Sequence, residues 1–386
     1  MRVDELALED WRNYERESLE LSRGLNLVVG PNAQGKTNLL EAVHCLSGFG
    51  SPRAADTALV RHGTERALLH AAAVRRAREV RIDLEIRPGK GTRALLNKTP
   101  VQPRLLGDMC VSVFFGPDEL SLIKGSPDGR RRFLDELVVK LRPARDGLRR
   151  EFDRTLKQRN ALLKSAPRGG SASVTATLDV WDAALARAGA ALTAVRLEVL
   201  AGLMPLAAKR YEEVAGGGRL ELEYASSWIA GEGSPGGIDA VPSDTSVLEE
   251  RLRDAIAAAR PREIERGVGL VGPQRDDVTV LLASGGGPGG SPTDARTFAS
   301  QGDQRTCALA LKLGEHDLLS DALGEEPILL LDDVFSELDP ARRAWLADAV
   351  RSIGQTLVST TEPEGVEMLS PDRVLEVSAG RVRTRD

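Results

Sequence analysis

Residues 30–37 read Gly-Pro-Asn-Ala-Gln-Gly-Lys-Thr and match the phosphate-loop pattern G-x-x-x-x-G-K-[ST] at every fixed position. The run 25–29 before the loop is apolar and predicts a buried strand, and the run 38–43 after it predicts the start of a helix. A strand that enters a glycine turn and then a helix points backbone N–H groups and the positive helix end at one place. The motif therefore predicts a fold that binds a nucleoside triphosphate.

The loop also predicts a role for its individual residues. Gly30 and Gly35 permit the tight turn and the close approach of the backbone to phosphate. Lys36 is expected to reach the β- and γ-phosphates, and the Thr37 hydroxyl is expected to ligate Mg²⁺. The candidate nucleotide-binding residues of the loop are Gly30, Pro31, Asn32, Ala33, Gln34, Gly35, Lys36 and Thr37.

A second half of the same site is predicted near the C-terminus. Residues 327–331 are apolar and lead into Asp332 and Asp333, the Walker B arrangement of a strand that ends in carboxylates. Asp332 is expected to hold Mg²⁺, and Asp333 stands where a general base could orient the attacking water. We therefore predict Lys36, Asp332 and Asp333 as catalytic residues, with Glu337 as the competing candidate for the base.

Length and composition limit the classes to which the protein can belong. The 386 residues exceed one ordinary domain, so two lobes are expected. The three cysteines are scattered and predict neither a disulfide framework nor a metal site. The N-terminus has no apolar leader, and no apolar run approaches the roughly 20 residues of a membrane span. We expect a cytoplasmic protein that makes no membrane contact.

Charge is distributed unevenly along the chain. The net charge is −5, yet residues 61–164 hold 24 Lys/Arg against 13 Asp/Glu, a surplus of 11. A basic stripe of this kind is typical of a surface that binds a polyanion, although a solvated face of ion pairs gives the same composition. The candidate DNA-binding residues are Arg75, Arg76, Arg78, Arg130, Arg131 and Arg132.

Hydrophobic periodicity separates the chain into two lobes. Short strands are expected before residue 117, and helix is expected from about 127 to 214. Apolar residues recur at spacings of 3 and 4 in 178–199, and a partner stripe lies in 148–163, across a Gly/Ser-rich break at 168–175. This pattern predicts a short antiparallel helical arm. We expect an ATPase lobe at 1–124 and 321–386 and a helical lobe at 125–320.

The segment 299–305, Ala-Ser-Gln-Gly-Asp-Gln-Arg, precedes a predicted helix some thirty residues before Walker B. Ser300 alone reads as an ordinary helix N-cap. In this order and spacing, however, the segment resembles the signature motif of ABC-type ATPases, and Ser336–Asp339 resembles their D-loop. The resemblance implies that Ser300 and Gly302 contact the nucleotide of the opposite subunit in a head-to-tail homodimer, and that Asp339 lies at the same nucleotide.

Within that class, the chain is most similar to the RecF family of bacterial recombination mediators. Residues 117–135 resemble a block characteristic of the family, 272–277 its Gly-Pro-His-Arg-Asp-Asp segment, 331–339 its C-terminal motif, and 11–14 (Trp-Arg-Asn-Tyr) its N-terminal Phe-Arg-Asn-Tyr. The resemblance implies an α/β, ABC-type and SMC-like ATPase head with a helical second lobe and arm. It also implies ATP and Mg²⁺ as cofactors, with Arg12 and Asn13 at the nucleotide.

The same resemblance implies a biological role. RecF proteins bind single- and double-stranded DNA near gaps, dimerise with ATP, hydrolyse it slowly in a DNA-dependent way, and work with RecO and RecR to load RecA in DNA repair and replication.

Three residues or segments depart from these patterns. Gln274 replaces the usual His of the 272–277 segment, no Gln follows the predicted strand at 111–115, and Thr360 and Thr361 stand where transporters place a switch His. A transporter subunit is thus disfavoured, and the helical insertion is too short for a long SMC coil. A small-molecule kinase would leave the basic stripe unexplained. A nucleotide-gated DNA clamp that does not hydrolyse ATP remains the alternative.

Overall fold

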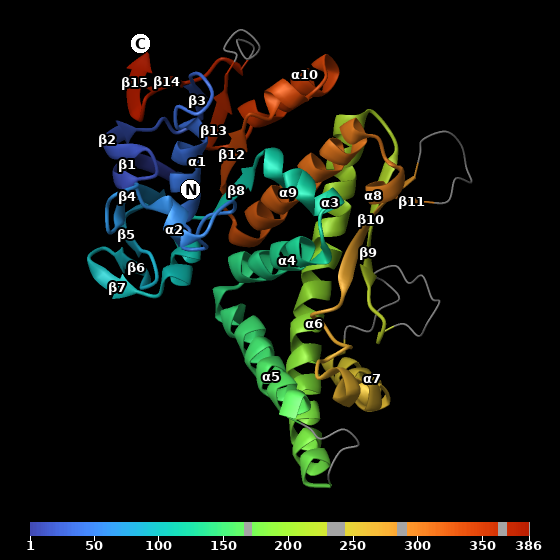
Figure 1. The fold of residues 1–386 in the computed structure, drawn as a ribbon. Helices are drawn as coiled ribbons and strands as arrows, with labels where there is room; N and C mark the ends of the chain where they lie inside the picture. The colour runs from blue at the N-terminus through green and yellow to red at the C-terminus, as the bar shows by residue number, and fades with distance from the viewer. Residues whose placement is uncertain (166–171, 230–243, 284–291, 362–368, 386) are drawn as a thin grey trace. The chain divides into compact units, whose positions relative to one another are not determined.

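The computed structural model describes residues 1–165, 172–229, 244–283, 292–361 and 369–385 (Figure 1). These residues form two compact units. Unit 1 consists of Met1–Leu120, Lys209–Gly217 and Gln301–Asp386, and unit 2 consists of Ser121–Ala208 and Gly218–Ser300.

The centre of unit 1 is a mostly parallel six-stranded sheet in the order β15-β14-β3-β13-β12-β8. Every residue of the three strands at its centre, β3, β13 and β12, is buried, as expected for a sheet with both faces covered. The strands are β3 (Leu25–Val29), β8 (Ser112–Phe115), β12 (Ile328–Asp332), β13 (Thr356–Thr360), β14 (Arg373–Ser378) and the antiparallel edge strand β15 (Arg381–Arg385).

A second sheet in unit 1 is antiparallel, in the order β2-β1-β4-β5-β6-β7. Its residues alternate between buried and exposed, because one face packs on the core and the other faces solvent. The buried face shares one hydrophobic core with helix α1 (Lys36–Cys45) and the central sheet. The strands are β1 (Arg2–Trp11), β2 (Tyr14–Glu20), β4 (Ala67–Arg75), β5 (Arg78–Arg87), β6 (Gly91–Leu96) and β7 (Thr99–Val101).

The other helices of unit 1 are α2 (Asp56–Leu59), α9 (Gln301–Leu323) and α10 (Pro340–Arg351), with 3₁₀ turns at Pro103–Asp108, Pro117–Leu120 and Phe335–Glu337. Helix α9 packs against β8 of the central sheet. For this reason the structure groups residues 301–320 with unit 1, whereas the sequence boundaries placed them in the second lobe.

Unit 2 is mainly helical, with a three-stranded antiparallel sheet in the order β11-β10-β9. Its elements are α3 (Ser121–Lys124), α4 (Pro127–Leu141), a 3₁₀ turn at Pro143–Arg145, α5 (Asp146–Ser165), α6 (Ala172–Ala215, whose last turns belong to unit 1), β9 (Arg219–Ala225), α7 (Thr245–Arg266), β10 (Asp277–Ala283), β11 (Thr293–Asp294) and α8 (Ala295–Phe298).

The expected helical arm is present as α5 beside α6 (Figure 1). Phe152 and Leu163 on α5, and Leu178 and Leu185 on α6, are buried as the apolar seams predict. A charged contact not foreseen from the sequence joins the helices, because the fully buried Arg159 pairs with Asp182 at 2.5 Å. The first half of the expected break at 168–175 lies outside the described residues, and α6 begins within the second half.

Helix α6 departs from one sequence expectation. Its segment Ala176–Ala215 is long and apolar enough to meet a length-and-composition criterion for a membrane span, although no apolar run of that size was expected. The core helix of a soluble protein meets the same criterion, and 56% of its most apolar window is buried in the protein. Burial of that extent favours a role in core packing.

Candidate functional site

The phosphate loop connects β3 to α1 and requires both of its glycines. Gly30 has φ +153° and Gly35 has φ +121°, in the region that L-residues with side chains avoid. A Cβ at Gly30 would lie 2.2 Å from the carbonyl oxygen of Val377, and one at Gly35 would lie 2.7 Å from Asn13 Nδ2. The loop is therefore a tight turn that ends at the N-terminus of a helix, where anions bind.

Lys36 is the first residue of α1, and its side chain folds back over the loop. Its Nζ donates hydrogen bonds to the carbonyl oxygens of Gly30 at 2.7 Å and Pro31 at 2.9 Å. Burial lowers the pKa of Lys36, and the nearby Asp333 and Asp332 partly offset that effect. The ammonium group is thus held at the mouth of the loop, opposite the two carboxylates.

Thr37 and Asp332 meet although they come from opposite ends of the chain. Thr37 Oγ1 donates to Asp332 Oδ1 at 2.9 Å, and Ser359 Oγ donates to the same oxygen at 2.6 Å. Burial raises the pKa of Asp332, and the hydrogen bonds from Ser359 and Thr37 oppose that shift. A hydroxyl beside a carboxylate is an all-oxygen donor set, which suits Mg²⁺.

Asp333 holds an unusual conformation next to this pair. Its φ is +52°, in the left-handed region that a non-glycine residue adopts at a free-energy cost of about 1–2 kcal/mol. Its backbone N–H donates to the carbonyl oxygen and the hydroxyl of Ser359. Its Oδ1 atom is buried and has no hydrogen-bond partner among the described residues. This oxygen can therefore accept a hydrogen bond from a water bound in the site.

These side chains surround a cavity of about 350 Å³ within unit 1. The lining brings together the loop, the Walker B pair, Arg53 and the first two residues of the 117–135 block. The lining residues are Asn32, Ala33, Gly35, Lys36, Thr37, Asn38, Arg53, Pro117, Asp118, Asp332 and Asp333. The phosphate loop, the two carboxylates and the oxygen donors fit a nucleoside triphosphate with Mg²⁺.

Sequence reasoning missed three residues of this site. Arg53 lines the cavity and pairs with Asp118 at 3.4 Å, and Ser359 contacts both Walker B residues. Arg53 belongs to no motif, Asp118 is noted only as part of the 117–135 block, and Ser359 lies in a short strand that has two other hydroxyl residues, Thr356 and Thr360. No local sequence signal distinguishes these residues as part of the site.

Arg12 and Asn13, predicted at the nucleotide, brace the loop and helix α1 and do not line the cavity. The Arg12 guanidinium forms a two-pronged ion pair with the buried Glu41 on α1, at 2.7 and 2.8 Å. Asn13 donates to the Gln34 carbonyl oxygen at 2.7 Å and accepts from Asn38 at 2.8 Å. In this structure the charge of Arg12 is paired with Glu41, and the predicted contact of Arg12 with the nucleotide stays a prediction.

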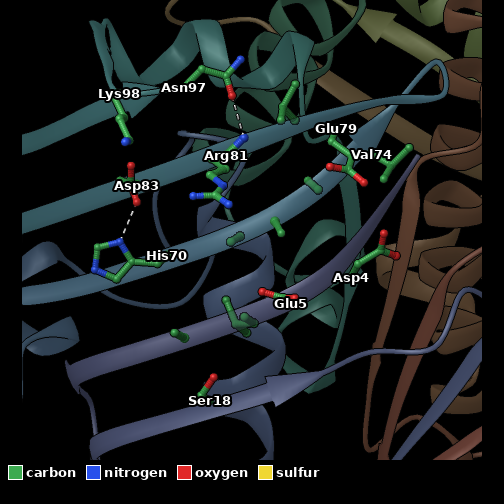
Figure 2. Close-up of a pocket in the computed structure, with 16 residues that line it drawn as sticks. Asp4, Glu5, Ser18, His70, Val74, Glu79, Arg81, Asp83, Asn97 and Lys98 are labelled. Atoms are coloured by element: carbon green, nitrogen blue, oxygen red, sulfur yellow. Dashed lines mark hydrogen bonds and ion pairs between the residues drawn. The ribbon is translucent and has the colours of Figure 1, made fainter.

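A larger hollow, of about 790 Å³, lies on the solvent face of the antiparallel sheet (Figure 2). Small residues such as Ala7 and Ala72 line it, and His70 pairs with Asp83 at 2.6 Å beside it. It has no phosphate loop, and several carboxylates line it, among them Asp4, Glu5 and Glu79. The smaller cavity contains the phosphate loop and the helix N-terminus that follows it, so it is the candidate site.

Comparison with known proteins agrees with this geometry. Residues 2–384 match the family model described as RecF/RecN/SMC N terminal domain. The chain is 46% identical over 389 residues to the DNA replication and repair protein RecF of Streptomyces avermitilis and 43% identical over 389 residues to that of Frankia alni, and each comparison covers 99% of both chains. This chain belongs to the RecF family.

Solved structures support the same assignment. The structure of the recombination mediator protein RecF with ATP in the RecFOR pathway matches with a TM-score of 0.87 and 28% identity, covering 100% of this chain and 97% of the other. An SMC head bound to the C-winged helix domain of ScpA matches with a TM-score of 0.56 at 16% identity, covering 100% of this chain and 97% of the other, which shows a shared fold. The ABC-type, SMC-like head expected from the sequence is thereby confirmed.

The structure gives positions for the residues that resemble a signature motif and a D-loop. Ser300 is exposed and immediately precedes α9, and Gly302 lies in the first turn of that helix. Asp339 caps α10 by accepting hydrogen bonds from the backbone N–H groups of Ala341 and Arg342, and these bonds lower its pKa. Glu337 pairs with Arg305 at 3.2 Å.

The predicted DNA-binding arginines separate into exposed ones and ones that are buried or mostly buried in ion pairs. Arg130 is 6% exposed and forms a two-pronged ion pair with Asp277 within unit 2. Arg131 is mostly buried and pairs with Asp128, and the buried Arg75 pairs with Glu325 at 3.1 Å. These three guanidinium groups are structural partners of carboxylates.

The other three candidates remain accessible to a ligand. Arg76 and Arg78 are exposed at the turn between β4 and β5, and Arg132 is exposed on α4. The predicted polyanion footprint is therefore smaller than the basic composition indicated.

Proposed function

We propose that this chain is an ATP-dependent DNA-binding protein of recombinational repair that hydrolyses ATP slowly in the presence of DNA. The observation that carries the proposal is the convergence of Lys36, Thr37, Asp332 and Asp333 on one cavity. The family assignment supports the DNA-repair role, since the full-length relatives are DNA replication and repair proteins.

The residues of the cavity divide the work of phosphoryl transfer. Thr37 and Asp332 would hold Mg²⁺, which neutralises phosphate charge when bound. Lys36 exchanges its hydrogen bonds to the loop carbonyls for contacts to the β- and γ-phosphates. Asp333 orients the attacking water and accepts its proton through the carboxylate oxygen that has no other donor among the described residues. Arg53, which pairs with Asp118 at 3.4 Å, lines the same cavity.

A non-hydrolysing nucleotide-gated DNA clamp is the second candidate. It would have no need for a base at the Asp333 position, so the buried Oδ1 atom, which has no donor in the described part of the chain, favours hydrolysis. Measuring phosphate release with and without DNA separates the two functions.

The assembly is also part of the proposal. Ser300 and Gly302 contact the γ-phosphate held by a second copy of the chain, so that two ATP molecules lie between head-to-tail subunits. The protein acts in the cytoplasm near single-strand gaps, with RecO and RecR, to load RecA. The name of the matching RecF–ATP structure, which places that protein in the RecFOR pathway, supports this partnership.

Sedimentation of the purified full chain tests the proposal. With Mg²⁺ and ATP the protein should sediment as a dimer, and with added gapped duplex DNA as a larger complex. Without nucleotide it should sediment as a monomer. A sedimentation coefficient that does not change with ATP would contradict the proposed assembly.

A further inference from the structure

Ser359 lies on the strand between the two halves of the nucleotide site. Strand β13 pairs in parallel with β12, where Ser359 is opposite Asp332, and with β3, which leads into the phosphate loop. Ser359 is fully buried in a strand whose five residues are all buried. A hydroxyl in such a place is unfavourable unless it is hydrogen-bonded, so its partners define its role.

Those partners are the two Walker B residues. Ser359 Oγ donates to Asp332 Oδ1 at 2.6 Å and accepts from the backbone N–H of Asp333 at 3.1 Å. The carbonyl oxygen of Ser359 also accepts from that N–H, at 3.2 Å. One residue therefore fixes both the side chain of Asp332 and the left-handed backbone turn that presents Asp333.

Asp332 Oδ1 is held from two sides. Thr37 donates to it from α1 and Ser359 donates to it from β13. When the Thr37 oxygen serves a metal, the donation from Ser359 remains as an anchor that keeps the carboxylate facing Thr37. Groups in this outer position orient metal ligands, and their loss typically weakens metal binding about 10–100-fold.

We propose that Ser359 is a positioning residue that presets Asp332 for Mg²⁺ at the nucleotide site. The inference rests on the proposed function, because it assumes that Thr37 and Asp332 bind Mg²⁺ with ATP. Loss of the Ser359 hydroxyl should therefore weaken Mg²⁺ binding. It should leave nucleotide binding without metal unchanged, because Ser359 does not line the cavity.

The test titrates Mg²⁺ into the full chain saturated with the β,γ-imido analogue of ATP and measures the dissociation constant calorimetrically. Binding of the same analogue is measured separately in EDTA. Ser359→Ala should raise the Mg²⁺ dissociation constant about 10–100-fold and change analogue binding in EDTA less than about twofold. Ser359→Cys, which keeps a weaker donor, should give an intermediate value.

Thr356→Val is the matched control. Thr356 is a fully buried hydroxyl residue on the same strand, and its Oγ1 atom has no hydrogen-bond partner among the described residues. This variant should keep the wild-type Mg²⁺ affinity, so a loss confined to the Ser359 variants cannot come from general disturbance of β13.

The outcomes are distinct. An unchanged Mg²⁺ affinity in Ser359→Ala overturns the inference, and so does an equal loss of analogue binding in EDTA, which would make Ser359 a general structural support. If the wild-type chain fails to bind the analogue under either condition, the proposed function itself fails.

Discussion

Thr37 on α1 donates a hydrogen bond of 2.9 Å to Asp332 at the end of β12, although 295 positions separate them in the chain. The contact arises because β3 and β12 flank β13 in one parallel sheet, so that their carboxyl ends lie at the same edge. Ligand sites in α/β sheets form at that edge. This contact joins the phosphate loop to Walker B.

Removal of the Lys36 ammonium group should abolish ATP hydrolysis. Lys36→Ala should also weaken ATP binding at least about tenfold, since a hydrogen bond to a charged group contributes about 1.5–3 kcal/mol. Calorimetric titration with ATP and a phosphate-release assay measure both effects. Lys90→Ala, which alters an exposed lysine, should behave as wild type. Wild-type affinity and turnover in Lys36→Ala would refute the assignment of the loop.

The general base can be identified by comparing two carboxylates. Asp333→Asn should lower turnover by about 10²–10⁴-fold while ATP still binds, because the amide cannot accept the proton. Glu337→Gln should have a much smaller effect, since Glu337 is exposed and paired with Arg305. Single-turnover phosphate release measures both. A greater loss in Glu337→Gln would move the role to that residue.

The proposed contact of Ser300 with the nucleotide of a second subunit predicts complementation between two mutants. Ser300→Arg should leave ATP binding intact and block ATP-dependent dimerisation, because its bulk enters a tight interface. Mixed with Lys36→Ala, it forms a heterodimer with one intact composite site and one doubly damaged site. Sedimentation and phosphate release of the mixture should recover part of what each variant lacks. Normal dimerisation of Ser300→Arg alone would leave Ser300 as a helix cap only.

Among the arginines, exposure decides which affect DNA binding. Arg76→Glu with Arg78→Glu should weaken duplex binding, and the salt-dependence slope should fall by about 0.9 for each phosphate that the protein no longer neutralises. Arg262→Glu, an exposed arginine on α7 outside the basic segment, is the control. Fluorescence anisotropy over a salt series measures the slope. Equal effects of the control and the double variant would show that position does not matter.

Arg130→Glu should act on stability. Arg130 is buried against Asp277, and breaking a buried pair destabilises a protein by about 3–5 kcal/mol. Thermal or urea unfolding should show this loss, whereas Arg132→Glu on the same helix should be nearly neutral because Arg132 is exposed. Similar unfolding midpoints for the two variants would contradict the structural role of Arg130.

Asp276 predicts a pH dependence of stability. Burial raises the pKa of Asp276 to about 6. Hydrogen bonds from Tyr224, Trp228 and other groups lower this pKa, but their effect is smaller than that of burial. The unfolded chain releases this proton near pH 4, and the folded chain retains it to about pH 6. Stability should therefore fall as pH rises through this window, by up to about 3 kcal/mol.

The side chain in Asp276→Asn cannot titrate. The free energy of unfolding of this variant should therefore fall less than that of the wild type between about pH 4 and 6. Asp254→Asn, an exposed aspartate on α7, should keep the wild-type profile. Identical pH profiles for wild type and Asp276→Asn would remove Asp276 as the source.

Local patterns in the sequence determined the phosphate loop, the Walker B strand and the two helices of the arm. Each depends on a few consecutive residues. The loop needs a residue such as Gly35 that can adopt φ +121°, and the strand is marked by the five apolar residues before Asp332. The periodic burial of Phe152 and Leu185 likewise follows from helix geometry alone. These features could be predicted without knowledge of any distant contact.

Only the tertiary structure decided which charges and hydroxyls have partners. Arg130 and Arg132 are two positions apart and are the same residue type, yet one is buried against Asp277 and the other is exposed. Ser359 became part of the site through the register of β13 against β12. Pairing and burial depend on residues that are distant in the chain and close in the fold, whereas the loop and strand motifs depend on neighbours in the chain.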